Sequence, residues 1–334
     1  MSNTSIGAGR SFVVAVPAYN EAGAIKACLD SIRVAAENAK EHGYKFEKVI
    51  VCINGCTDET EAVVRGYTQL PLELIVSEAG YIKAMNALLQ YVRRKYPQSF
   101  IVKTDADAMI APDSLLVLFS QFARHPKMLV VGGHPYPLIV HKTNAARRFL
   151  ASVLSVRSRT PEAEVTTTDT RRFHPYAVSD PIPELKGREE LLKIYFHGRL
   201  WCARSARCLP NLPTDVIGDD VYFPGWLLHH HGFNSMRLDY RAKVFFYPND
   251  SLIRHWRVYR RIHEDRRLVY GIKGFEEYAR ACPLKLDWRY ILTHTRPREV
   301  LQFALYASIV FIERLTYRFI EYKPAYWQYE QKEG

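Results

Sequence analysis

Apolar runs typical of buried strands alternate with amphipathic segments over residues 11–107, and this alternation limits the fold more than any other feature. The apolar runs are residues 11–20, 46–54, 72–77 and 99–107, and the segments with helical spacing between them are residues 21–43, 55–67 and 82–96. Continuous apolar strands between amphipathic helices are typical of a parallel sheet covered on both faces. The sequence therefore predicts an α/β fold with a mostly parallel central sheet flanked by helices.

Candidate binding residues stand where the predicted strands end. They are found at 17–21, where Pro17 is expected to stop the first strand, at 54–58 after the second, and at Asp105 and Asp107 at the end of the fourth. Right-handed crossovers bring the carboxyl ends of parallel strands to one edge of a sheet, where ligands bind. We therefore expect a binding site at this edge.

Asp105 and Asp107 are the acidic residues that point most directly to chemistry. In an extended strand, residues two apart face the same side, about 7 Å from each other. Two unpaired buried carboxylates would disfavour each other's ionisation, and a divalent cation removes that conflict. Mg²⁺ and Mn²⁺ prefer oxygen ligands and share them with substrate phosphates. The alternative is that one aspartate caps a turn and the other is solvated.

Three further motifs suggest a ligand, and each has a structural alternative. "VPAYNEAGAI" (16–25) lacks the glycines of a phosphate loop, but Tyr19 could hold a flat base or sugar. The alternative for this motif is a turn followed by a helix cap. Asn54 could hydrogen-bond a base edge, while Asp58 is expected to cap the next helix. In "GDDVYF" (218–223), one carboxylate of Asp219 and Asp220 could accept a proton from a hydroxyl nucleophile. The alternative is an acidic helix N-cap.

The formal net charge of +11 favours an anionic partner. Nucleic acid, an anionic membrane surface and a phosphorylated small molecule all fit that charge. No nucleic-acid-binding motif or basic tail is present, so we expect no nucleic acid partner. The densest basic stretch is "RHWRVYRRIHEDRR" (254–267), which is also consistent with a solvated helix face.

Cysteine usage and the first residues bear on the compartment. The six cysteines are scattered without zinc-site spacing, which is typical of reduced thiols in a cytoplasmic protein. "MSNTSIGAGR" has no apolar signal segment, and residues 1–10 are expected to be disordered. A cytoplasmic location is therefore expected. Attachment to the inner face of a membrane is a further hypothesis, based on the basic stretch at 254–267 and on the aromatic and apolar residues of 298–329.

The second half of the chain has a different pattern. Residues 141–190 are polar and weakly periodic apart from a short predicted helix at 144–157, so we expect a mobile loop region that meets the acceptor. Strand character returns at 191–209 and 236–248, and residues 251–334 are expected to form a helical extension. Within 298–329, the uncharged run of 300–312 is shorter than the about 20 residues that span a bilayer. An interfacial helix and a helix packed on the catalytic domain remain as alternatives.

The ordered set of motifs resembles a known family. "VVAVPAYNEAGAIKACLDSI", "VCINGCTDET", "KTDADA", "LWCARSARCL" and "GDDVYF" stand in the order seen in family 2 glycosyltransferases. The resemblance covers about residues 11–230. It implies the GT-A fold, a Rossmann-like catalytic domain over residues 11–250 with its nucleotide-binding half at 11–110. It also implies inverting transfer of a sugar from a UDP-sugar to a hydroxyl acceptor, lipid-linked or on a glycan, with Mn²⁺ or Mg²⁺.

The resemblance also assigns roles to single residues. Asp107 and Asp105 would hold the metal, with His255 as a third ligand, and Asp220, the second acid after Asp219, would be the general base. From their spacing alone, Arg254, Arg257 and Arg261 lie near one face of a predicted helix, and we expect them to contact the diphosphate. The residues implied to bind the nucleotide are Pro17, Ala18, Tyr19, Glu21, Asn54, Lys83, Asn86, Asp105 and Ala106.

Two other classes of protein are weighed against the transferase. A nucleotidyltransferase would also combine an α/β sheet with metal-binding acids, but it should carry a glycine-rich loop after the first strand, where this chain has "PAYNEAG". A noncatalytic carbohydrate- or partner-binding module would not need Asp105, Asp107 and Asp220 together. It would also bind its ligand without a divalent metal.

Overall fold

The computed structural model describes residues 9–139, 144–166, 196–281 and 284–317. These fall into two compact units. Unit 1 contains residues 9–135 and 196–245, and unit 2 contains residues 136–139, 144–166, 246–281 and 284–317. Residues 1–8 of the expected disordered start at 1–10, most of the expected acceptor loop and residues 318–334 lie outside the described residues.

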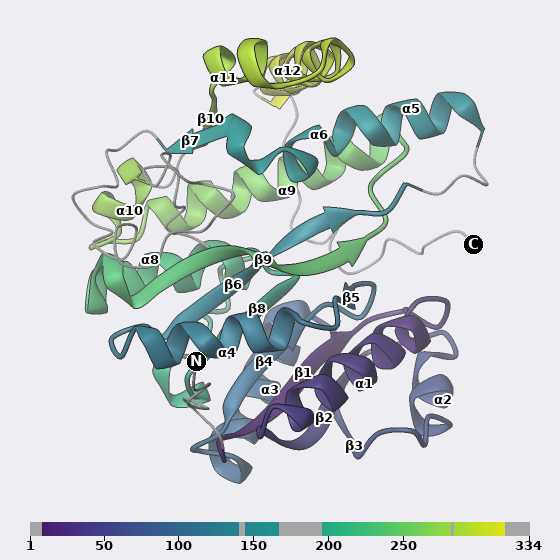
Figure 1. Cartoon of the computed structure of the whole chain (residues 1–334), viewed down its shortest axis with the longest axis vertical. Helices are drawn as coiled ribbons and strands as arrows, with labels where there is room; N and C mark the ends of the chain where they lie inside the picture. Colours follow the sequence, from purple (N-terminus) through teal and green to yellow (C-terminus); the bar gives the residue numbers. More distant parts are fainter. Residues whose placement is uncertain (1–8, 140–143, 167–195, 282–283, 318–334) are drawn as a thin grey trace, which may run out of the picture. The chain divides into compact units, whose positions relative to one another are not determined.

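Unit 1 is built on an eight-stranded sheet in the order β3-β2-β1-β4-β8-β6-β9-β5 (Figure 1). Its first half is parallel, as the alternation in the sequence predicts, and consists of β1 (Ser11–Ala18), β2 (Lys45–Asn54), β3 (Leu72–Ser77) and β4 (Phe100–Thr104). Pro17 was expected to stop the first strand, yet β1 continues to Ala18. The proline is tolerated because pairing with β4 ends at Ala15, so that Pro17 pairs with β2 alone.

The second half of the sheet introduces antiparallel pairing. It consists of β8 (Leu200–Ala203), β6 (Val130–Pro137), β9 (Met236–Phe246) and β5 (Met109–Ile110). β8 runs antiparallel to both β4 and β6, and its first residue, Leu200, pairs with Thr104 at the end of β4. The residues just before β8 therefore lie at the same edge as the ends of the parallel strands.

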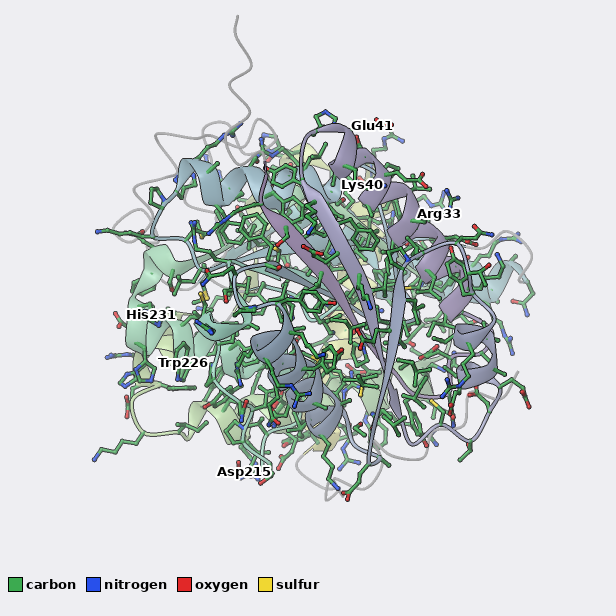
Figure 2. All side chains as sticks on the ribbon, turned by 90° about the horizontal axis from the view of Figure 1, so that it is seen from below. Arg33, Lys40, Glu41, Asp215, Trp226 and His231 are labelled. Carbon is green, nitrogen blue, oxygen red and sulfur yellow. The ribbon has the colours of Figure 1, made fainter. Side chains whose placement is uncertain are left out.

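Helices pack against unit 1's sheet through apolar stripes. They are α1 (Ile25–Glu41), α2 (Thr60–Arg65), α3 (Tyr81–Lys95), α4 (Ser114–Arg124) and α8 (Asp219–His231). Figure 1 shows α1 and α4 on one face of the sheet and α3 on the other. In α1, Ile25, Leu29 and Ile32 are buried at helical spacing, whereas Lys40 and Glu41 project to solvent (Figure 2).

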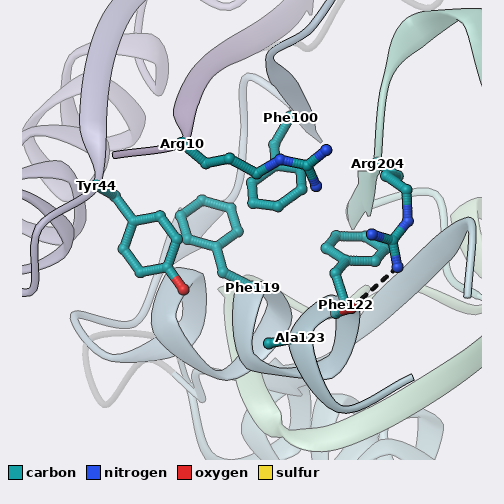
Figure 3. A pocket seen from close by; sticks show the side chains of 7 residues that line it. All are labelled: Arg10, Tyr44, Phe100, Phe119, Phe122, Ala123 and Arg204. Carbon is teal, nitrogen blue, oxygen red and sulfur yellow. Dashed lines mark hydrogen bonds between the residues drawn. The ribbon is translucent and has the colours of Figure 1, made fainter. Parts of the chain in front are cut away.

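An aromatic cluster closes the opposite edge of the sheet, where β1 and β4 begin. Its pocket is lined by Arg10, Tyr44, Phe100, Phe119, Phe122, Ala123 and Arg204 (Figure 3). Arg204 donates hydrogen bonds to the carbonyls of Phe122, His125 and Met128. These carbonyls lie at and just beyond the end of α4, where backbone acceptors have no partner within the helix. Arg204 therefore has a structural role as a side-chain cap.

Unit 2 is mainly helical. It contains α5 (Ala145–Leu154), α6 (Val156–Arg159), α9 (Leu252–Tyr270), α10 (Glu276–Ala281), α11 (Trp288–His294) and α12 (Pro297–Tyr317), with a two-stranded sheet of β7 (Glu164–Thr166) and β10 (Leu284–Leu286). Its core is formed by Val153, Val156, Ala163, Ile291, Phe303 and Tyr306. The helix predicted at 144–157 is divided into α5 and α6, and Asn144 caps α5. The C-terminal helices expected from the sequence are present as α9, α10, α11 and α12.

The helix α12 bears on the expectation that residues 300–312 are too short to span a bilayer. Taken whole, the helix has 21 residues with a mean hydropathy of 1.2 over its most apolar window. By length and composition alone it could therefore cross a membrane. Of that window, 22% is buried within the protein.

Candidate active site

A buried lysine joins the end of β4 to the segment before β8. Lys103 is fully buried, and its ammonium donates hydrogen bonds to the Asp105 carboxylate and to the carbonyl of Gly198. Burial opposes ionisation of both side chains, but their opposite charges favour it more strongly. As a result, the pKa of Asp105 is lowered and that of Lys103 is raised.

Asp219 is held by two donors from different parts of the sequence. The Tyr81 hydroxyl donates to one carboxylate oxygen at 2.7 Å, and the Trp201 indole N–H donates to the other at 2.7 Å. Burial raises the pKa of Asp219; the charge of Lys103 opposes this rise, and that of Asp220 adds to it. Both oxygens of Asp219 are therefore committed to contacts within the protein.

Asp220 is more accessible than Asp219. It is half-buried, and one of its oxygens accepts a hydrogen bond from the Gly198 backbone N–H at 3.3 Å. A Cβ atom at Gly198 would stand 3.3 Å from the Asp220 carboxylate and 3.4 Å from that of Asp219, so glycine permits this close approach. Gly132 has a similar role beneath the same segment, because a Cβ there would lie 2.2 Å from the Cβ of Phe196.

The turn after β4 separates the two aspartates of the Asp-x-Asp. The strand was expected to continue through residue 107, but β4 ends at Thr104, and the N–H of Ala108 bonds to the carbonyl of Asp105. Asp105 consequently faces Lys103, whereas Asp107 is paired with Arg199 at 3.4 Å. The strand geometry inferred from the sequence is therefore wrong for this pair, because a turn orients the second carboxylate.

The charges around this segment suit a cation. This part of the site contains four carboxylates, those of Asp105, Asp107, Asp219 and Asp220. The two cationic side chains that contact them, Lys103 and Arg199, offset only part of this negative charge. Within the described ranges, no group of three His, Cys, Asp or Glu side chains could hold a metal ion. Mg²⁺ and Mn²⁺ commonly use one or two protein carboxylates and take their other ligands from phosphates and water. The half-exposed Asp107, which follows Asp105 by two residues in this turn, fits that donor set.

The loops after β1 and β2 are fastened together at the same edge. Asn20, which has a positive φ of 51°, accepts a hydrogen bond from the Thr57 N–H at 2.8 Å. Thr60 accepts from the Glu21 N–H at 2.7 Å, and Asp58 accepts from the Ala22 N–H at 3.1 Å. Asp58 also accepts from the N–H of Thr60, the first residue of α2, but the N-cap position is Glu59 and not Asp58 as expected. These contacts hold Pro17, Ala18, Tyr19 and Glu21 in one rim.

Three predicted nucleotide-binding side chains have partners within the protein. The Asn54 carbonyl oxygen accepts from the Gly80 N–H at 2.7 Å, and both ends of the Asn86 amide bond to the backbone of Leu212. Lys83 pairs with Glu78 at 2.5 Å on the surface. Asn54 and Asn86 therefore position neighbouring loops. Their contacts with a nucleotide stay predictions, as does that of Lys83 and of Ala106, which is buried within the turn after β4.

The remaining predicted residues lie on α9 of unit 2. Arg254 and Arg257 are exposed, and Arg261 is half-buried. His255 points into unit 2, where its Nε2 lies 3.8 Å from the Glu313 carboxylate. Burial and then the charge of Arg157 lower the pKa of His255 to about 4, while burial raises that of Glu313 to about 7. Despite the short distance, both shifts oppose an ion pair between the two groups.

Sequence reasoning missed the residues that connect the acids. Lys103, Tyr81, Gly198, Arg199 and Trp201 were not singled out, although each contacts one of the four aspartates or lies against it. One signal was available, since Lys103 interrupts an otherwise apolar strand in "FIVKT". A lysine in a buried strand requires a partner.

The amino-acid sequence was compared with models of known protein families. The family model described as "Glycosyl transferase family 2" matches residues 13–187. No curated protein sequence matches the chain.

Several solved structures are similar to this one. A mannosyltransferase from Pyrobaculum calidifontis, in complex with GDP-Man and Mn²⁺, has 18% identity and a TM-score of 0.51, over 95% of this chain and 82% of that one. TarS from S. aureus has 14% identity and a TM-score of 0.45, over 91% and 80%. Glucosyl-3-phosphoglycerate synthase from Mycobacterium tuberculosis has 15% identity and a TM-score of 0.45, over 78% and 81%. The similarity to the mannosyltransferase shows a shared fold.

We predict that Lys103→Met lowers the free energy of unfolding by about 3 kcal/mol, because it leaves Asp105 without its buried counter-charge. Lys103→Met combined with Asp105→Asn should be less destabilised than the sum of the two single variants, since neither charge remains. Urea unfolding at neutral pH measures all four proteins. Strictly additive losses would show that the two side chains do not interact.

We predict that Glu313→Gln stabilises the protein more at pH 8 than at pH 5, by roughly 1–3 kcal/mol. Because the pKa is raised, folded Glu313 keeps its proton at pH values where the unfolded chain has lost it. The contribution of Glu313 to the free energy of unfolding of the wild type therefore falls as the pH rises from about 4.5 through about 7. Gln does not ionise, and the titration of His255 is common to both proteins. Denaturant unfolding at the two pH values tests this, and a pH-independent difference would contradict it.

Proposed function

The chain belongs to glycosyltransferase family 2, and we propose that this enzyme transfers a sugar from a UDP-sugar to a hydroxyl acceptor with inversion at the anomeric carbon, using a divalent metal. The observation that carries the proposal is the linkage of two acidic pairs through one short segment. Lys103 and Arg199 connect residues 197–199 to Asp105 and Asp107, and Gly198 contacts Asp220. The transfer needs one acidic group to hold the cation that binds the donor diphosphate, and a second one nearby to take the proton of the acceptor hydroxyl.

In this proposal the nucleotide lies against the rim made by Pro17, Ala18, Tyr19 and Glu21. Support comes from the hydrogen bonds that fasten this loop to Thr57 and Thr60, since a loop that is already ordered loses little entropy when it binds a ligand. Asp105, which is kept ionised and oriented by Lys103, would accept hydrogen bonds from the ribose. UDP is assigned from the family resemblance, and the fold relative from Pyrobaculum calidifontis, which binds GDP-Man, makes a guanosine donor the alternative to test.

Asp107, with Asp105 beside it, is the proposed holder of Mn²⁺ or Mg²⁺. When bound, the ion offsets the charge that develops on the leaving diphosphate. Mn²⁺ in the complex of the Pyrobaculum calidifontis mannosyltransferase supports this choice. Arg199 pairs with Asp107 and is therefore a cationic side chain beside the proposed ion site. Arg254, Arg257 and Arg261 are further proposed diphosphate contacts, and His255 stays a prediction as a third ligand.

Asp220 is the proposed general base. Both oxygens of Asp219 already accept hydrogen bonds, whereas Asp220 is half-buried and oriented by one backbone N–H. Asp220 would take the proton of the acceptor hydroxyl as that oxygen attacks the anomeric carbon. The bond from the anomeric carbon to the diphosphate oxygen breaks, and UDP leaves. A single base and a direct displacement invert the configuration.

We predict that UDP binds more weakly in EDTA than in Mn²⁺, by on the order of 10-fold or more, which is about 1.4 kcal/mol. Asp107→Ala should lose both this dependence on metal and the added affinity, because it removes the carboxylate most open to the ion. Asp215→Ala, which changes an exposed acid, is the matched control. Titration calorimetry decides the matter, and equal affinity of the wild type in both conditions would refute the metal site.

We predict that Asp220→Asn lowers kcat by about 10²-fold or more while donor binding is nearly unchanged, as expected for loss of a general base. Asp219→Asn should reduce kcat less but lower the melting temperature, since Tyr81 and Trp201 share a weaker acceptor. A panel of UDP- and GDP-sugars with Mn²⁺, read out by nucleotide release through slow hydrolysis, first identifies the donor. If Asp219→Asn has the greater effect on kcat, then Asp219 is the base.

A further inference from the structure

Helix α12 presents two different faces. Its inner face carries the buried residues Gln302, Phe303, Tyr306 and Glu313. Gln302 bonds to Ser152 at 2.8 Å and to Arg159 at 2.7 Å. Tyr306 accepts a hydrogen bond from Arg157 at 2.9 Å. This face is therefore fixed to unit 2 by polar as well as apolar contacts.

The outer face of the same helix is apolar and exposed. Leu301, Phe311, Ile312 and Leu315 each expose more than half of their surface, and their spacing places them on one side of the helix together with Ala304 and Ser308. Exposed Trp288 and Leu292 of the adjoining α11 extend the apolar surface. Within unit 2, α12 packs against α5, α6, α9 and α11 (Figure 1). Such a contiguous apolar patch marks an interaction site.

The charges around this patch are almost all positive. The exposed cations of residues 284–317 are Lys285, Arg289, Arg296, Arg298 and Arg314. The three acids of this range are engaged in the fold: Asp287 caps α11, Glu299 accepts from the Arg296 N–H, and Glu313 is buried. An apolar surface edged by cations complements an anionic lipid headgroup layer above an acyl core.

We propose that α11 and α12 lie in the plane of an anionic membrane surface, with Leu301, Phe311, Ile312 and Leu315 in the headgroup and acyl boundary and the surrounding cations against the headgroups. The length of α12 would also permit it to span a bilayer. However, spanning would remove Gln302, Tyr306 and Glu313 from their partners and expose them to lipid. The inference goes beyond the proposed transferase activity and does not depend on it.

Flotation of the full-length protein with vesicles tests this surface. We expect binding to phosphatidylcholine vesicles that contain phosphatidylglycerol, weak binding to phosphatidylcholine alone, and release by high salt. Leu301→Ser with Leu315→Ser, and separately Arg289→Gln with Arg298→Gln, should each reduce the partition coefficient by roughly 10-fold or more. Far-ultraviolet circular dichroism and melting temperatures check that the variants remain folded, which their exposed positions favour.

Matched controls separate this surface from general hydrophobicity and charge. Val76→Ser changes an exposed apolar residue of β3, and Lys40→Gln with Arg207→Gln removes two exposed charges in unit 1. Neither control should alter vesicle binding by more than about 2-fold. Equal binding to neutral vesicles, or retention that only detergent reverses, would overturn the in-plane proposal. Absence of vesicle binding with a dimer that the Leu301→Ser/Leu315→Ser variant dissociates would assign the patch to a second copy of the chain.

Discussion

The buried ammonium of Lys103 is the constraint around which the candidate site is arranged. A charge that has no access to water must be neutralised and fully hydrogen-bonded, or folding becomes very costly. Lys103 meets this need with the carboxylate of Asp105 on one side and the carbonyl of Gly198 on the other. The same ion therefore orients the first aspartate of the Asp-x-Asp and fixes the segment that approaches Asp220.

The antiparallel strand β8 makes this arrangement possible. It runs beside β4 in the opposite direction, so the residues that precede it arrive at the edge where the parallel strands end. Trp201 pairs with Lys103 across the two strands and donates its indole N–H to Asp219. Two neighbouring acids at the start of α8 thereby acquire different environments. One is locked in place by two donors, and the other keeps an accessible oxygen suited to accepting a proton.

Unit 2 combines polar contacts inside with apolar side chains outside. Its inner contacts include a buried pair, His255 and Glu313, in which burial favours the neutral form of each group. Its outer helix places leucine, isoleucine and phenylalanine where a water-soluble surface would normally carry polar residues. A transferase whose acceptor hydroxyl is carried on a lipid would benefit from such a surface, because the acceptor and the enzyme would then meet at the same interface.

The sequence by itself determined the parallel half of the sheet, the helices between its strands and the edge at which the acids gather. These features follow from the local periodicity of apolar residues, which can be recognised within windows of about 10 to 20 residues. It also identified Asp105, Asp107, Asp219 and Asp220 as acids of interest, and the family to which the motifs belong. The turn at 105–108 was taken for strand, because an isolated Asp-x-Asp does not reveal where a strand ends.

Only the tertiary structure decided which residues meet. The pairing of β4 with β8 joins segments about 100 residues apart, and no local pattern specifies that partnership or its register. For the same reason the amides of Asn54 and Asn86 could not be assigned to Gly80 and Leu212 in advance. A polar side chain in a sequence shows that a partner is required. The partner itself is set by the packing of the whole domain, since burial and hydrogen bonding are satisfied between segments that are distant along the chain.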